Sequence, residues 1–154
     1  MAMAHRPFEK PNPRTGKKEP KAEPIIRQAR VAIFEDNAMV CFAYSEILSA
    51  CASVVYATPV LTVDEAIAVF LRERPDVVIT DLSLNDKGTE GFEILRRIRE
   101  ISPSTPVGLS TSSYHPQKND EINREIRRQG FDALFQKADT RQMCEFVQAS
   151  APKS

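Results

Sequence analysis

Between Arg30 and Ala149, short apolar segments alternate with longer segments whose apolar residues recur at helical spacing. The short segments are expected to be strands, at Arg30–Phe34, Ser53–Ala57, Val77–Ile79, Val107–Leu109 and within Phe131–Gln136. The longer segments are expected to be helices, at Ala38–Ser49, Thr62–Arg72, Phe92–Ile101, Asn119–Gln129 and Thr140–Ala149. Strands that alternate with helices in this way predict a parallel sheet covered on both faces, with right-handed crossovers.

Five strand and helix pairs suit a doubly wound α/β fold. We expect the flavodoxin-like (βα)5 arrangement, with strand order 2-1-3-4-5. In the first helix, Met39, Phe42, Ala43 and Ile47 recur at helical spacing, which predicts that they form its apolar face, and Asn37 is the expected N-cap.

The length of 154 residues, 42% of them hydrophobic, indicates one domain with one core. We expect that domain to span residues 27–150, followed by a short tail at residues 151–154. Residues 1–24 hold six basic residues, three acidic residues and five of the 11 prolines. A segment with so few aliphatic side chains cannot offset the entropy of ordering, so residues 1–26 are expected to be a disordered basic arm.

The net charge of zero provides no overall field that would attract DNA or an anionic membrane. The three cysteines, Cys41, Cys51 and Cys144, lie in apolar segments without metal-binding spacing. Their odd number argues against both a metal site and a disulfide framework. No apolar run is long enough to span a membrane, so we expect a cytoplasmic protein with reduced cysteines.

Acidic side chains follow two of the strands that this order would place side by side. Glu35 and Asp36 follow the first strand, and Asp81 follows the third. Three carboxylates that meet at one edge of a sheet repel one another unless a cation lies between them, and a small oxygen-rich site suits Mg²⁺. Asp81 could then act as an anionic nucleophile toward phosphorus. Lys137 after the fifth strand and Thr111 after the fourth could contact the phosphoryl oxygens.

From about Arg27 to Ala149, this pattern resembles the receiver domain of a two-component response regulator. The residues that carry the resemblance are Glu35-Asp36, Asp81, Thr111 at the end of the run Pro106–Thr111, and Lys137. The resemblance implies that Asp81 is the phosphoacceptor and that Glu35, Asp36, Asp81 and the backbone carbonyl of Ser83 hold Mg²⁺. It also implies that Thr111 is the switch hydroxyl and that Lys137 pairs with the phosphate.

The resemblance further implies a signalling switch rather than an enzyme, although the family assists its own phosphorylation and dephosphorylation. The expected phosphodonor is a sensor histidine kinase or a histidine phosphotransfer protein. Because no effector domain follows the last expected helix, we expect a single-domain regulator that acts by binding a downstream protein or by relaying phosphate, without direct contact to DNA. The sequence leaves open whether the active form is a monomer or a homodimer.

The chain departs from the family pattern in three places. Asn85 and Thr89 stand where the family has proline and glycine, and glycine arrives at Gly91, so the loop after Asp81 is expected to be two residues longer. Ala138 replaces the cis proline that usually follows the lysine, and a non-proline cis bond costs about 3 kcal/mol. Leu134 replaces the aromatic residue that couples to the switch hydroxyl, a role for which Tyr114 is a candidate substitute.

These departures support an alternative function. The chain could be a degenerate receiver that binds a partner without being phosphorylated. Two enzyme or cofactor classes fit less well. A haloacid-dehalogenase-like phosphatase needs an acid where Ser83 stands, and the acids Glu35 and Asp36 would repel the phosphate of a flavin.

Overall fold

The computed structural model describes residues 27–85, 88–137 and 139–152, which form five strands and five helices. The strands are β1 (Arg30–Phe34), β2 (Ser53–Tyr56), β3 (Val77–Thr80), β4 (Val107–Ser110) and β5 (Ala133–Phe135). The helices are α1 (Ala38–Leu48), α2 (Val63–Glu73), α3 (Glu90–Ile101), α4 (Glu121–Gln129) and α5 (Thr140–Ala149). The proposed disordered arm at residues 1–26 lies outside the described residues.

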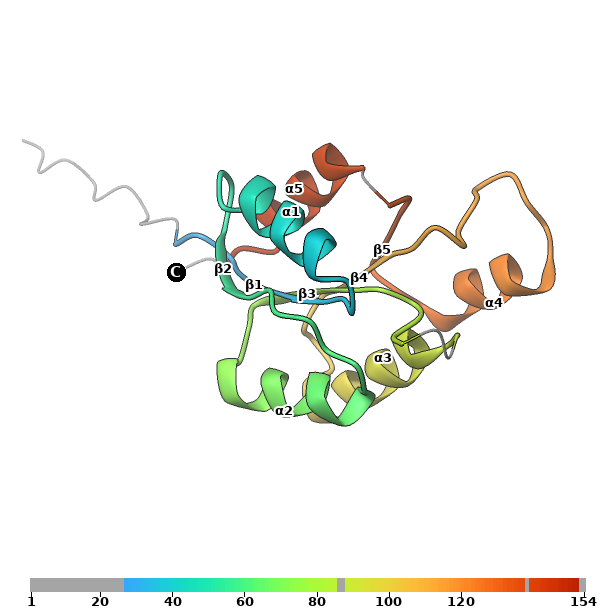
Figure 1. The fold of residues 1–154 in the computed structure, drawn as a ribbon, viewed down its shortest axis with the longest axis horizontal. Helices are drawn as coiled ribbons and strands as arrows, with labels where there is room; N and C mark the ends of the chain where they lie inside the picture. The colour runs from blue at the N-terminus through green and yellow to red at the C-terminus, as the bar shows by residue number, and fades with distance from the viewer. Residues whose placement is uncertain (1–26, 86–87, 138, 153–154) are drawn as a thin grey trace, which may run out of the picture.

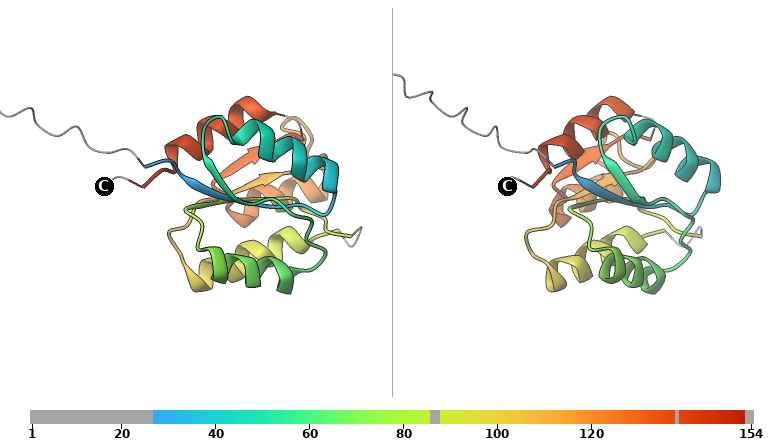
Figure 2. Two further views of the ribbon diagram at one scale, coloured as in Figure 1. Left: turned by 60° about the vertical axis from the view of Figure 1, so that its left-hand side comes forward. Right: turned by 90° about the vertical axis from the view of Figure 1, so that its left-hand side faces the viewer.

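All five described strands are parallel, in the order β2-β1-β3-β4-β5. This confirms the predicted flavodoxin-like topology. Helices α1 and α5 lie side by side on one face of the sheet, and α2 and α3 lie on the other (Figures 1 and 2). Helix α4 stands beyond α3, near β4 and β5 (Figure 1).

Strand β1 supplies side chains to the hydrophobic cores on both faces of the sheet. Val31 and Ile33 are buried against α1 and α5, whereas Ala32 and Phe34 are buried against α2 and α3. This alternation follows from the period of two in a strand, and it explains why a central parallel strand is apolar throughout. No helix of the described residues is both long and apolar enough to cross a membrane.

Helix α1 packs on a different face from the predicted one. Met39 is 82% exposed and Phe42 is 68% exposed, while Cys41, Tyr44 and Leu48 are buried. The helix is apolar on both sides, so spacing alone could not identify the buried side. The cap was predicted correctly, because Asn37 accepts hydrogen bonds from the backbone N–H groups of Met39 and Val40.

The prediction for the cysteines was also wrong. A disulfide joins Cys51, in the turn after α1, to Cys144 in α5, with the two Cα atoms 6.2 Å apart. Cys41 is the free cysteine and is buried in α1. An odd number of cysteines therefore did not exclude a bond between two of them, since the pairing depends on how α1 and α5 pack.

Candidate functional site

The register of β1 on β3 brings the three acidic side chains together. Phe34 pairs with Thr80 at the carboxyl ends of the two strands. The backbone N–H of Asp81 donates to the carbonyl of Phe34 over 2.8 Å, so the residues that follow each strand are neighbours. Carboxylate oxygens of Glu35, Asp36 and Asp81 all lie within 4.8 Å of one another. The predicted cluster is therefore observed, and the role of each residue in it remains a prediction.

Each carboxylate of the cluster is also held by a backbone amide. Asp81 accepts a hydrogen bond from the N–H of Leu82 at 2.7 Å, and Asp36 accepts one from the N–H of Asn85 at 2.9 Å. Glu35 accepts one from the N–H of Asn37 at 3.2 Å. Each of these hydrogen bonds uses one oxygen of its carboxylate. The second oxygen of each carboxylate can contact a cation in the cluster.

Lys137 reaches the cluster from the end of β5. Its Nζ lies 3.1 Å from Oδ2 of Asp81 and 3.6 Å from Oε2 of Glu35. Burial acts against the charged form of Lys137, but the carboxylates of Asp81 and then Glu35 outweigh it and raise the pKa of the amine. The Lys137–Ala138 peptide bond involves Ala138, which lies outside the described residues. The lysine nevertheless reaches Asp81.

Glu35 is the most buried acid of the cluster, with 2% of its surface exposed. Burial, together with the negative charge of Asp81, raises the pKa of Glu35 from 4.5 to about 8, although Lys137 opposes the shift. Without a metal, the site therefore favours the protonated form of Glu35 more than water does. A divalent cation would take the place of that proton, because it stabilises the ionised form.

The raised pKa of Glu35 predicts how the stability of the metal-free protein depends on pH. Protonation of Glu35 favours the folded state, so its contribution is complete below pH 4.5 and is lost as the pH rises through about 8. We expect the free energy of unfolding in EDTA to fall by about 2 kcal/mol between roughly pH 6 and pH 8. Denaturant titrations at both pH values would measure this.

Two further titrations test the assignment to Glu35. Glu35→Gln should make the stability in EDTA nearly independent of pH over this range, because the amide does not titrate. Mg²⁺ should restore most of the stability that the natural chain loses at the higher pH. An equal loss in the natural chain and in Glu35→Gln would contradict the assignment.

The cluster lies in a polar cavity of about 440 Å³ at the carboxyl edge of the sheet. Its lining also includes Ser83 and the hydroxyl-rich segment Thr111–Ser113. The hydroxyl oxygen of the buried Thr111 accepts a hydrogen bond from the N–H of Ser113 at 3.2 Å. Because that contact uses only the oxygen, the hydroxyl proton can be donated to a ligand in the cavity.

The donors in this cavity suit Mg²⁺. They are carboxylate oxygens from Glu35, Asp36 and Asp81, which lie close together without sulfur or imidazole among them. Hard oxygen ligands of this kind, with space for water and a phosphate oxygen, are the environment that Mg²⁺ prefers. The cavity is large enough for a phosphoryl group beside the cation.

Gly91 allows helix α3 to start against the backbone of Asp81. A Cβ atom at this position would lie 2.5 Å from the carbonyl oxygen of Asp81 and 2.9 Å from Cα of Leu82. The N–H of Gly91 donates to the carbonyl of Leu82 over 2.8 Å. Gly91 lies two residues later than the family pattern places its glycine. At this position a larger residue would displace Asp81 or α3.

Two polar contacts behind the cavity were not predicted from the sequence. Tyr44 of α1 and Ser110 of β4 are both buried, and their hydroxyl groups lie 2.9 Å apart. Asn123 of α4 is fully buried; it accepts a hydrogen bond from the N–H of His115 and donates one to the carbonyl of Ser113. The spacing of residues in a largely polar helix does not indicate that an asparagine such as Asn123 is buried and binds a loop.

Leu134 and Tyr114 belong to one apolar cluster near α4. They pack against the buried side chains of Leu82, Leu109 and Ile126. The position that the family fills with an aromatic residue is thus filled by a half-buried leucine. Whether Tyr114 substitutes for that aromatic residue stays a prediction.

Comparisons with known proteins agree with this fold. Residues 31–148 match the family model described as the response regulator receiver domain. No curated protein is similar enough in sequence to count as a match.

Solved structures give the same fold. A CheY-like response regulator receiver domain protein from Methanospirillum hungatei is 22% identical, with a TM-score of 0.63 over 79% of this chain and 92% of that chain. A LuxR-family two-component response regulator from an Aurantimonas species is 21% identical, with a TM-score of 0.63 over 79% and 84% of the two chains. The BeF3-activated receiver domain of DrrB is 25% identical, with a TM-score of 0.63 over 80% and 97%.

Proposed function

The chain belongs to the response regulator receiver domain family of two-component signalling, and from that premise we propose that Asp81 accepts a phosphoryl group from a histidine kinase or a histidine phosphotransfer protein. The observation that carries the proposal is the position of Lys137 Nζ, 3.1 Å from Oδ2 of Asp81 and beside the acid pair. A lone buried aspartate would be a poor acceptor, whereas this one has Lys137 and the hydroxyl of Thr111 beside it as partners for the incoming phosphate.

In this proposal, Glu35, Asp36, Asp81 and the backbone carbonyl of Ser83 would hold Mg²⁺. When bound, the metal neutralises charge on the phosphoryl oxygens. A carboxylate oxygen of Asp81 attacks phosphorus while the bond from phosphorus to the donor histidine nitrogen breaks. Lys137 then pairs with a phosphoryl oxygen, and the hydroxyl of Thr111 donates a hydrogen bond to another.

We propose that Thr111 passes the signal to α4. Phosphorylation adds a charge of roughly −1.5 to −2 at Asp81, which attracts the Thr111 hydroxyl. The N–H of Ser113 contacts Thr111, and the carbonyl of Ser113 accepts a hydrogen bond from Asn123 over 3.3 Å. A shift of Thr111 therefore acts on a loop that is bound directly to α4. The altered face would bind a downstream protein or favour phosphate relay.

Labelling of the natural chain tests the function. With Mg²⁺ and acetyl phosphate, the intact mass should increase by one phosphoryl group, and EDTA should prevent the increase. No increase under either condition would favour the alternative, a degenerate receiver that binds its partner without phosphorylation.

The exposed side of α1 is the proposed contact for the phosphodonor. The helix starts one residue after Asn37, which lines the cavity of Asp81. Met39 and Phe42 are in its first turns and are largely exposed. A donor histidine must come close to Asp81, so the protein that carries it would cover this apolar surface.

Phe42→Ser should slow phosphotransfer from the kinase that phosphorylates the natural chain by about ten-fold, because the buried area of an aromatic anchor is lost. Labelling by acetyl phosphate should be unchanged, since a small donor needs no docking surface. Leu71→Ser is the matched control, because Leu71 is also an exposed apolar residue, but on α2. Equal slowing by both substitutions would contradict docking on α1.

A further inference from the structure

The disulfide lies at the end of the molecule opposite to Asp81. It joins Cys51 and Cys144, which are 93 residues apart in sequence. Cys51 lines a cavity of about 350 Å³, together with Arg27, Gln28 and Ala29 before β1 and Gln148 and Ala151 at the end of α5. These residues stand at the amino edge of the sheet, whereas Asp81 follows the carboxyl end of β3.

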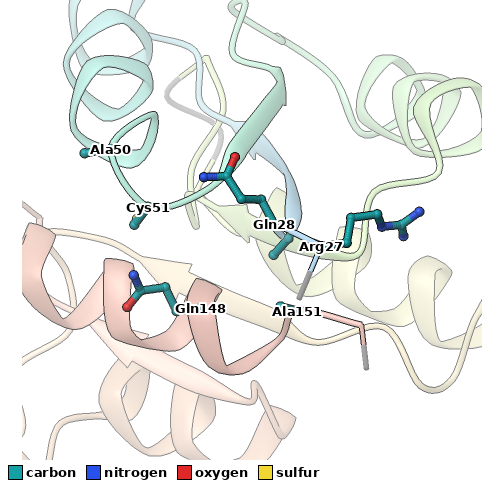
Figure 3. A pocket seen from close by; sticks show the side chains of 7 residues that line it. Arg27, Gln28, Ala50, Cys51, Gln148 and Ala151 are labelled. Carbon is teal, nitrogen blue, oxygen red and sulfur yellow. The ribbon is translucent and has the colours of Figure 1, made fainter. Parts of the chain in front are cut away.

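Cys51 is one of the residues that line this cavity, and it is half-buried. Figure 3 shows Cys51 in the turn after α1, with Gln28 and Gln148 extending from the segment before β1 and from α5. Both of these glutamine side chains are exposed, and both cysteines of the disulfide are only half-buried. A disulfide that can be reached from solvent is open to attack by a thiolate, unlike a bond enclosed in a core.

Two of the residues that line the cavity beside Cys51 carry amide groups. The amides of Gln28 and Gln148 can both donate and accept hydrogen bonds. A thiol that carries a carboxylate and peptide groups, such as glutathione, would find partners here.

We propose that Cys51 and Cys144 form a reversible redox site that exchanges with low-molecular-weight peptide thiols through this cavity. In the reducing direction, the thiolate of the small thiol attacks the sulfur of Cys51, a mixed disulfide forms, and Cys144 leaves as a thiolate that takes up a proton. A second small thiolate attacks the sulfur that the first small thiol contributes to the mixed disulfide. Cys51 then leaves as a thiolate that takes up a proton. The net reaction converts one protein disulfide and two small thiols into two protein thiols and one oxidised small disulfide.

The site predicts which cysteine forms the mixed disulfide. Cys51 lines the cavity, but Cys144 does not. With Cys144→Ser, oxidised glutathione should add one glutathionyl group at Cys51, which intact mass and peptide mapping would detect. With Cys51→Ser, the addition at Cys144 should be much slower. Faster addition at Cys144 would overturn the assignment of Cys51 as the entry point.

Exchange in the natural chain tests reversibility. The full-length protein is equilibrated in glutathione buffers of different redox ratio, trapped with an alkylating agent and analysed by mass. We expect two of the three cysteines to change together from alkylated to protected as the buffer becomes oxidising, while Cys41, which is 1% exposed, provides an internal control in the folded protein. A Cys51–Cys144 pair that does not form in oxidising buffer, or that does not open in reducing buffer, would overturn the proposal.

The outcome is independent of the proposed phosphorylation. Exchange is measured by thiol content, and Asp81 is not involved. Should a serine variant fail to fold, the buffer titration of the natural chain still decides the matter. A chain that exchanges thiols but is not labelled by acetyl phosphate would support the redox site and contradict the phosphoacceptor. A chain that is labelled but does not exchange thiols would support the phosphoacceptor and contradict the redox site.

Discussion

Asp81→Asn should abolish labelling by acetyl phosphate in the presence of Mg²⁺. The amide is not a nucleophile toward phosphorus, and it removes the negative charge that Lys137 contacts at 3.1 Å. Loss of a covalent nucleophile lowers rates by at least about three orders of magnitude, so the intact mass should show no added phosphoryl group over the time in which the natural chain is fully labelled.

Asp76→Asn provides the matched control for this experiment. Asp76 directly precedes β3, just as Asp81 directly follows it, so the two substitutions make the same chemical change at opposite ends of one strand. The carboxylate of Asp76 accepts a hydrogen bond from the N–H of Arg30, which an asparagine oxygen can also accept. Labelling should persist in Asp76→Asn. Labelling of Asp81→Asn at the rate of the natural chain would exclude Asp81 as the acceptor.

The position of the site could be predicted because it depends on the backbone. Apolar runs predict the strands, and the alternation with helices predicts a parallel sheet, for which the order 2-1-3-4-5 is one of the common solutions. The carboxyl ends of the strands then lie at a known edge. Glu35, Asp36 and Asp81 follow strands that are neighbours in that order, so their meeting is a consequence of topology.

The details of the site could not be predicted because they depend on loops and on packing. The amide of Asn85 that holds Asp36 belongs to the loop after β3, where Asn85 has a positive φ of 53°. The burial that raises the pKa of Glu35 arises from the whole fold. Helix α1 presented apolar residues on two sides, and only its packing against α5 decides that Tyr44 is buried and Phe42 is exposed.

Reduction of the Cys51–Cys144 disulfide should lower the free energy of unfolding by about 4 to 5 kcal/mol. The bond closes a loop across a separation of 93 residues, and the cross-link restricts the unfolded chain by an amount that increases with the logarithm of loop length. For a chain of this size, the change corresponds to a decrease in the melting temperature of roughly 10–15 °C. It would be measured by denaturant titration of the oxidised chain and of the Cys51→Ser, Cys144→Ser double variant.

The double variant separates the cross-link from other effects of a reducing agent. Adding reductant should destabilise the natural chain to nearly the level of the variant, and it should leave the variant unchanged, because Cys41 is buried and forms no disulfide. The denaturant dependence should also become steeper without the bond, since the unfolded chain then exposes more surface. Equal midpoints for the oxidised chain and the variant would mean that the bond adds no stability. If the midpoints differ as expected, the redox state of the Cys51–Cys144 pair sets the stability of the fold that holds Glu35, Asp36 and Lys137 in place.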